Sequence, residues 1–158
     1  MEALTGTWRL TSWSAVWAYE FDGPPEEFLY QDPAIALPRT DDAGEVRGSI
    51  LAIGADGGFS QSGECDRPIL TYDEEGVQVG GVAEFGGIVR EDGERGYLLR
   101  REVRSPAART APTRLRWDDG DTRVCDSIRV LGSRLVRAIC VVTDECYGDR
   151  VVLVYERC

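Results

Sequence analysis

The sequence contains no histidine and no lysine, so all 18 of its basic residues are arginine. Histidine is the commonest general base and metal ligand, and its absence removes Ser-His and Cys-His nucleophile pairs and most hydrolytic mechanisms. Asparagine is missing as well. The joint loss of these residue types indicates codon bias in a GC-rich bacterial genome rather than selection for guanidinium chemistry.

Long hydrophobic runs and excess positive charge are also lacking. No apolar stretch approaches the ~20 residues that span a bilayer, and no charged start precedes an apolar segment as in a signal peptide. The 28 acidic residues outnumber the bases and give a formal charge of −10. Because a field of that sign repels phosphates, we expect no nucleic-acid or membrane partner. The missing span and signal pattern predict a cytoplasmic location. A homodimer is left open.

Cysteine is present, but not in a pattern that predicts disulfides or metal. The five cysteines are odd in number and irregularly spaced, so reduced thiols are expected. A zinc site built on Cys140 and Cys146 would need two further thiolates. The sequence therefore predicts neither a metal nor another cofactor.

The first strand carries an unusual load of aromatic residues. It runs from Gly6 to Phe21 and contains three of the four tryptophans as well as Tyr19. So much ring surface on one strand needs a wide interior to face, and a closed antiparallel barrel supplies one. Trp13 and Trp17 are out of phase with Trp8, so they face inward only if a bulge near Thr11 or Ser12 shifts the strand.

Proline and glycine then interrupt the chain over residues 22–44. Proline removes donors from a β-ladder, so this stretch is not central sheet. Pro24 and Pro25 suit the first turn of a short helix. A long connection of this kind, with apolar residues beside a barrel mouth, is a lid or plug; a solvated loop is the alternative, and both stay open.

From Glu45 onward, short alternating strands and turn signals follow one another with almost no helical spacing. About ten strands result. The 158 residues are expected to form one domain, a single antiparallel up-and-down β-barrel of eight to ten strands with a Pro-rich loop or short helix after the first strand.

Two hairpins allow the register to be predicted. The turn Ala55-Asp56-Gly57 places Ile53 opposite Phe59 and Leu51 opposite Gln61. Strands are expected over Thr122–Leu131 and Arg134–Thr143, joined by a turn at Gly132. A turn that pairs Val130 with Arg134 places even-numbered residues of both strands inside.

On that register, Asp126 is the one carboxylate on an apolar inner face. Cys140 points in and Cys125 points out, an arrangement unsuited to a disulfide. In the last strand Val151, Leu153 and Tyr155 are expected to face inward.

Three stretches of the chain resemble lipocalins and related calycins. The opening Leu4-Thr5-Gly6-Thr7-Trp8-Arg9-Leu10 is similar to the Gly-x-Trp strand that begins those proteins. The turn from Ala55 to Ser60 resembles their second hairpin. The final strand, Val151 to Arg157, resembles the closing strand of fatty-acid-binding proteins. The resemblance implies a lipocalin-like barrel over residues 1–158.

The same resemblance assigns structural roles to two residues. It implies that Trp8 closes the barrel floor and that Arg157 packs over it from the last strand. Where fatty-acid-binding proteins place an Arg-x-Tyr pair, this chain has Leu153-Val154-Tyr155. The main partner of a fatty-acid carboxylate is therefore missing.

The candidate ligand-contacting residues are mostly aromatic. They are Trp13, Trp17, Tyr19, Phe59, Phe85, Tyr97, Trp117, Cys140 and Tyr155. Ordinary core packing is the alternative for each of them, and Cys140 has no histidine or lysine to activate it.

Asp126 and Gln61 are the candidate catalytic residues. Desolvation of a carboxyl with few partners suits a general acid or a hydrogen-bond donor to a carbonyl. The alternative is that an arginine such as Arg101 or Arg116 pairs with Asp126 inside the barrel.

Two functions are compatible with these residues. The favoured one is binding of a hydrophobic small molecule, such as a polyketide-like intermediate, followed by a cofactor-free intramolecular cyclisation. It rests on the resemblance, because similar small bacterial barrels include Diels-Alderase-type cyclases, and such reactions need a dry site that holds reacting ends close. The other is a carrier or sequestering protein without catalysis.

Overall fold

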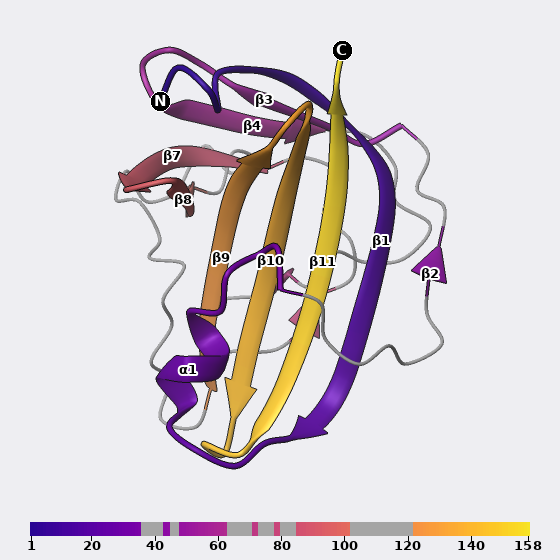
Figure 1. The fold of residues 1–158 in the computed structure, drawn as a ribbon, viewed down its shortest axis with the longest axis vertical. Helices are drawn as coiled ribbons and strands as arrows, with labels where there is room; N and C mark the ends of the chain where they lie inside the picture. Colours follow the sequence, from indigo (N-terminus) through magenta and orange to yellow (C-terminus); the bar gives the residue numbers. More distant parts are fainter. Residues whose placement is uncertain (36–42, 45–47, 63–70, 73–77, 80–84, 102–121) are drawn as a thin grey trace.

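A computed structural model describes residues 1–35, 43–44, 48–62, 71–72, 78–79, 85–101 and 122–158 of this protein. Its main feature is a closed antiparallel barrel, drawn in Figure 1. The eight barrel strands are β1 (Gly6–Glu20), β3 (Ile50–Ile53), β4 (Gly58–Ser62), β7 (Phe85–Asp92), β8 (Arg95–Arg101), β9 (Thr122–Leu131), β10 (Arg134–Thr143) and β11 (Tyr147–Arg157). Neighbouring strands follow sequence order, and pairing of β1 with β11 closes the sheet. The predicted fold class is confirmed.

Smaller elements surround this barrel. Strand β2 (Ala43–Gly44) pairs with β1, and β5 (Thr71–Tyr72) pairs with β6 (Gln78–Val79) in a separate ribbon. Helix α1 (Pro25–Leu29) follows β1 and begins with a proline, which has no N–H to lose in the first helical turn. The predicted short helix after the first strand is therefore present. Neither it nor any other helix in the described ranges is long and apolar enough to cross a membrane.

Strand β1 contains a bulge at the position on which the inward orientation of Trp13 depends. Leu10 pairs with Tyr155 and Ser12 with Val154, so Thr11 is an extra residue in the ladder. The extra residue reverses the alternation and turns Trp13 into the core, where its side chain is 8% exposed. A second irregularity lies between Val16 and Tyr19.

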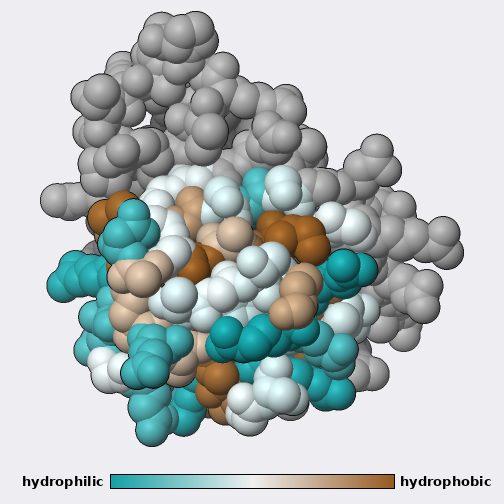
Figure 2. Space-filling view, turned by 90° about the horizontal axis from the view of Figure 1, so that it is seen from above, coloured by the Kyte–Doolittle hydropathy of each residue, from teal (hydrophilic) through white to brown (hydrophobic). Residues whose placement is uncertain are grey.

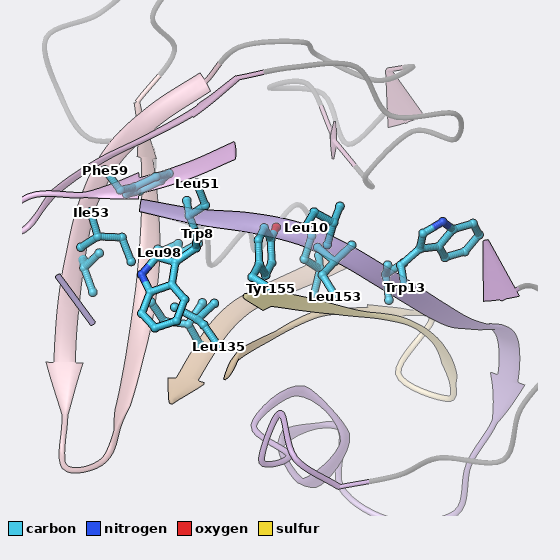
Figure 3. Close-up of a cluster of buried hydrophobic side chains, with 14 of the residues drawn as sticks. Trp8, Leu10, Trp13, Leu51, Ile53, Phe59, Leu98, Leu135, Leu153 and Tyr155 are labelled. Carbon is cyan, nitrogen blue, oxygen red and sulfur yellow. The ribbon is translucent and has the colours of Figure 1, made fainter. Parts of the chain in front are cut away.

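The interior core is drawn in Figure 3, where residues of β1, β3, β4 and β11 point toward one another. Trp8 is buried at the end of the barrel where both termini lie, and its indole Nε1 donates to the Leu4 carbonyl. The Arg157 guanidinium lies 4.3 Å from the centre of its ring and donates to the carbonyls of Thr5 and Ala3. The expected pairing of Trp8 with Arg157 is confirmed.

Gly6 explains the Gly-x-Trp spacing. Its φ is +142°, and a Cβ there would lie 2.6 Å from Nη1 of Arg157. Only glycine accepts both conditions.

Figure 2 shows this end of the barrel from outside, with apolar residues in separate patches among polar ones. Ile88 and Leu131 are exposed large apolar side chains in the described chain, and single ones are ordinary on a protein surface.

The predicted strand register is confirmed for one hairpin and wrong for the other. Between β3 and β4, Ile53 pairs with Phe59 and Leu51 with Gln61, as expected. Between β9 and β10 the prediction is wrong by one residue, because Leu131 pairs with Arg134 across a two-residue turn, Gly132–Ser133. A slip of one residue exchanges the two faces of a strand. Even-numbered residues of β9 face inward as predicted, but odd-numbered residues of β10 do so.

Residues 21–35, here called the cover segment, lie against the outer wall of the barrel. Phe28 and Leu29 of α1 are buried against residues of β9 and β10, namely Cys125, Ala138, Cys140 and Val142. Figure 1 shows the helix in front of these two strands. Both predictions for this stretch, a lid or plug at the mouth and a solvated loop, are therefore wrong for residues 22–35. The rest of the predicted range lies outside the described residues, apart from 43–44.

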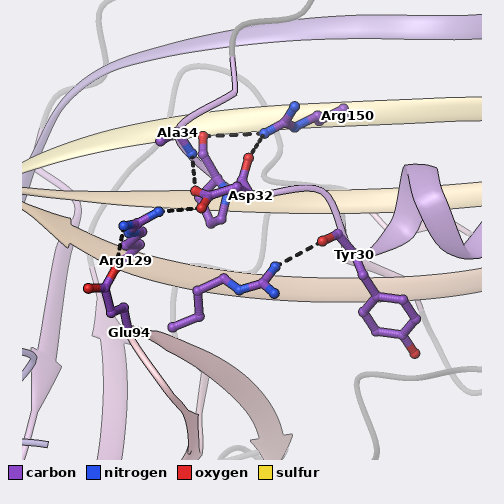
Figure 4. Close-up of polar contacts among 8 residues, drawn as sticks. Tyr30, Asp32, Ala34, Glu94, Arg129 and Arg150 are labelled. Carbon is purple, nitrogen blue, oxygen red and sulfur yellow. Dashed lines mark hydrogen bonds and ion pairs between the residues drawn. The ribbon is translucent and has the colours of Figure 1, made fainter.

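Arginines from the barrel hold the cover segment in place (Figure 4). Arg150 of β11 is 1% exposed and donates to the carbonyls of Asp32, Pro33 and Ile35 and to the side chain of Gln31. Arg129 bonds the Asp32 carboxylate and Glu94. Burial raises the pKa of Asp32, but the Ala34 N–H and Arg129 outweigh that effect and lower it below its usual value. These contacts make the cover segment part of the wall.

Close packing of Phe28 on β11 gives a testable prediction. A Cβ at Gly148 would lie 2.3 Å from Cζ of Phe28, so the Gly148→Ala variant must displace α1. We expect it to lower the free energy of unfolding by about 1–3 kcal/mol in urea denaturation. Because a smaller residue at position 28 relieves the clash, Gly148→Ala should cost less in a Phe28→Leu background. Equal costs in the two backgrounds would contradict this explanation.

Candidate functional site

The candidate site is a polar network inside the barrel, among the apolar side chains of the described core. Its members are Ser49, Gln61, Asp126, Arg137 and Tyr155, each 4% exposed or less. They come from β4, β9, β10, β11 and the residue that precedes β3. Five separate parts of the chain thus place polar side chains at one level of the barrel.

Arg137 is the centre of this network. Its Nε donates to Oδ1 of Asp126 at 2.7 Å and its Nη2 to Oδ2 at 2.5 Å, a bidentate pair. Nη1 donates to Oε1 of Gln61 at 2.5 Å and to the Tyr155 hydroxyl at 3.5 Å. Planar guanidinium and carboxylate groups match well in this geometry, which fixes both side chains.

The pair is fully buried, with both side chains 0% exposed. Burial by itself would lower the pKa of Arg137, but the negative charge of Asp126 raises it overall, so Arg137 remains a cation. A carboxylate that accepts two bonds from a guanidinium has the role of acceptor. The geometry therefore favours the arginine-paired alternative for Asp126 over a general acid.

Gln61 extends the network to Ser49. Its Nε2 donates to Oγ of Ser49 at 3.2 Å, while its Oε1 accepts from Arg137. An amide nitrogen carries two hydrogens. Among the described residues, the second hydrogen of Gln61 and the hydroxyl hydrogen of Ser49 have no acceptor, so this corner of the interior offers hydrogen-bond donors.

Five of the predicted site residues face the interior. Asp126, Gln61 and Tyr155 belong to the polar network, and Trp13 and Phe59 belong to the surrounding core. Phe85 is the backbone partner of Gln61 in β7. The side chains of Phe85 and Trp17, and the whole of Trp117, lie outside the described residues.

Three predicted site residues lie on the outer wall, which corrects their assignment to the interior. The ring of Tyr19 is 38% exposed and stacks on Phe28, because the second irregularity in β1 turns it outward. Tyr97 packs edge-on against Tyr30 under the cover segment. Cys140 faces α1, because the strand register differs by one residue from the predicted one.

Sequence reasoning missed Arg137 and Ser49. The missed signal is Gly132-Ser133, a pair that favours a two-residue hairpin with positive φ at its first position. Gly132 has φ of +60°. Read in that way, the turn places Arg137 on the inner face beside Asp126. Arg116 and the side chain of Arg101, the partners expected for Asp126, lie outside the described residues.

Cys125 and Cys140 are directly opposite each other on the outer face, where α1 buries both. Burial raises the pKa of the Cys140 thiol to about 12, and the thiolate is the reactive form. We therefore expect maleimide at neutral pH to label Cys158, which is exposed, well before Cys140, as resolved by peptide mass spectrometry. The Phe28→Ala variant should accelerate labelling of Cys140. Equal labelling rates at Cys140 and Cys158 in the native protein would contradict this arrangement.

Within the described ranges, no group of three or more potential ligands gathers to hold a metal ion.

A scan against protein-family models finds no match, and searches of curated proteins and of solved structures find no significant one. The likeness to calycins therefore rests on the architecture of the barrel and on the Trp8–Arg157 contact. It extends to the fold, and a fold of this kind hosts many functions.

Proposed function

We propose that the barrel binds a predominantly apolar small molecule, whose polar group meets the network around Arg137. The observation that supports this proposal is the network itself, which includes donors without acceptors among the described residues, inside a wall of apolar side chains. Ligand sites commonly combine apolar walls with a few convergent polar groups. The Arg-x-Tyr pair of fatty-acid carriers is absent, and Arg137 enters from a different strand.

Titration with Nile red, a neutral apolar dye, tests binding. We expect saturable binding with one site per chain and a blue-shifted emission. Ala15 and Ser14 are neighbours on β1, and Ala15 belongs to the interior core while Ser14 faces the other way. Ala15→Phe should weaken dye binding about tenfold or more, and Ser14→Phe should leave it unchanged.

Dye binding that does not saturate would contradict the proposal. So would equal affinities in the two variants, provided that their circular dichroism spectra show folded barrels. Equal affinities would place the dye on the outer surface.

Catalysis of a cyclisation is a second candidate, and the donor capacity of Gln61 supports it. Nε2 of Gln61 donates one hydrogen to Ser49 and keeps the other. Such a donor would polarise a substrate carbonyl, and apolar walls would hold the reacting ends together. Asp126, already an acceptor for Arg137, would orient the guanidinium.

A linear 1,3-diene tethered to an enone serves as the probe for this reaction. If the barrel is a cyclase, the protein should increase the first-order rate of ring closure, and Gln61→Met should remove most of that increase at saturating probe concentration. Tight binding of an unchanged probe would assign the barrel to the carrier class instead.

A further inference from the structure

We propose that the polar group recognised inside the barrel is a neutral hydrogen-bond acceptor, such as the carbonyl of a ketone, ester, lactone or amide, and not a carboxylate. This inference rests on the proposed function, because it names the class of ligand for the same interior site. Two independent features of the network lead to it.

The first feature is the charge balance. Asp126 and Arg137 are the charged side chains that the described residues place inside the barrel, and they form a bidentate pair with 0% exposure. Their charges cancel. This ion pair therefore offers no uncompensated cation to a ligand carboxylate, in an interior where removing an ion from water is costly. A neutral group carries no such penalty.

The second feature is that the hydrogen-bonding groups that remain available in this corner are donors. Gln61 is 4% exposed and Ser49 is 1% exposed. Oε1 of Gln61 already accepts a hydrogen bond from Arg137, and Nε2 donates one of its two hydrogens to Ser49. Within the described chain this corner retains donor hydrogens. A buried donor without a partner is costly, so the group that completes the corner is an acceptor.

Three probes of similar size separate the alternatives. Octanoate and 2-nonanone have the same number of heavy atoms, and nonane lacks a polar group. At neutral pH, calorimetric titration of the native protein should show 2-nonanone binding about tenfold tighter than either octanoate or nonane. A ketone that binds no better than nonane would mean that water alone completes the corner, and octanoate as the tightest ligand would mean that the site is cationic. Either result overturns the inference and leaves the proposed function in place.

Variants then test each feature separately. Asp126→Asn removes the negative charge and keeps the shape, so the uncompensated Arg137 should invert the preference in favour of octanoate. Gln61→Met removes the donor and should lower ketone affinity to that of nonane. The surface carboxylate of Glu156, which pairs with Arg134 outside the barrel, supplies the matched control, and Glu156→Gln should change none of the affinities.

The outcomes distinguish this inference from the proposed function. If Asp126→Asn does not fold, Gln61→Met and the native ranking decide the matter. If folded Asp126→Asn keeps the native ranking, or if Gln61→Met keeps full ketone affinity, the inference is wrong. If neither the native protein nor its folded variants bind any of the probes or Nile red, the proposed function itself is wrong.

Discussion

Substituting Asp126 alone by alanine is expected to lower the free energy of unfolding by about 3–5 kcal/mol, because the Arg137 charge would then be buried without its partner. The two side chains are 0% exposed and joined by two hydrogen bonds. The loss of one partner leaves the desolvation cost of the other uncompensated. Urea denaturation followed by circular dichroism measures the change.

Two controls identify the cause. The double variant Asp126→Leu with Arg137→Met removes both charges and retains apolar volume, so its cost should be much smaller than that of Asp126→Ala. Glu156→Ala removes a carboxylate from an exposed pair with Arg134, and its effect should not exceed about 1 kcal/mol. A double variant as unstable as the single one would show that the pair contributes more than charge compensation.

Replacing Trp8 by alanine is expected to have a comparable effect, about 3–5 kcal/mol, since it empties the closed end of the barrel. The indole is 1% exposed, donates to the Leu4 carbonyl and lies under the Arg157 guanidinium. Its loss removes a large buried surface and leaves that carbonyl without its donor. Differential scanning calorimetry should show a marked fall in the melting temperature.

The partner of Trp8 supplies the comparison. Arg157→Leu loses the cation–π contact and two hydrogen bonds to carbonyls near the N-terminus. Because the Arg157 side chain is exposed, we expect a cost nearer 1 kcal/mol. If Trp8→Ala cost no more than Arg157→Leu, the indole would not be the main support of this end of the barrel.

Local patterns predicted much of the fold because they depend on neighbours in sequence. An inward position of Trp13 depended on an extra residue near Thr11 or Ser12, and the ladder has one at Thr11. Asp56 stabilises its own turn by accepting from the Gly58 N–H, which is why the β3–β4 register followed from the turn residues. The bounds of β9 and β10, Thr122–Leu131 and Arg134–Thr143, also agree with the expected strands.

The candidate site was less predictable because it depends on register. Side chains alternate between the two faces of a strand, so an error of one residue at Gly132 assigned Cys140 and Arg137 to the wrong faces of β10. With Arg137 assigned to the outside, two roles stayed open for Asp126, a general acid or the partner of an arginine such as Arg101 or Arg116. Correct placement makes the carboxylate half of an ion pair.

The sequence by itself determined that this chain forms a closed antiparallel barrel, because strand alternation and turn chemistry are local, and its resemblance to calycins implied that Trp8 and Arg157 meet at one end. Only the tertiary structure decided which side chains meet. It placed the cover segment on the outer wall through Arg150 and Arg129, whose partners lie about a hundred residues away in sequence. It also brought Gln61, Asp126 and Arg137 together, since contacts across several strands depend on every register between them.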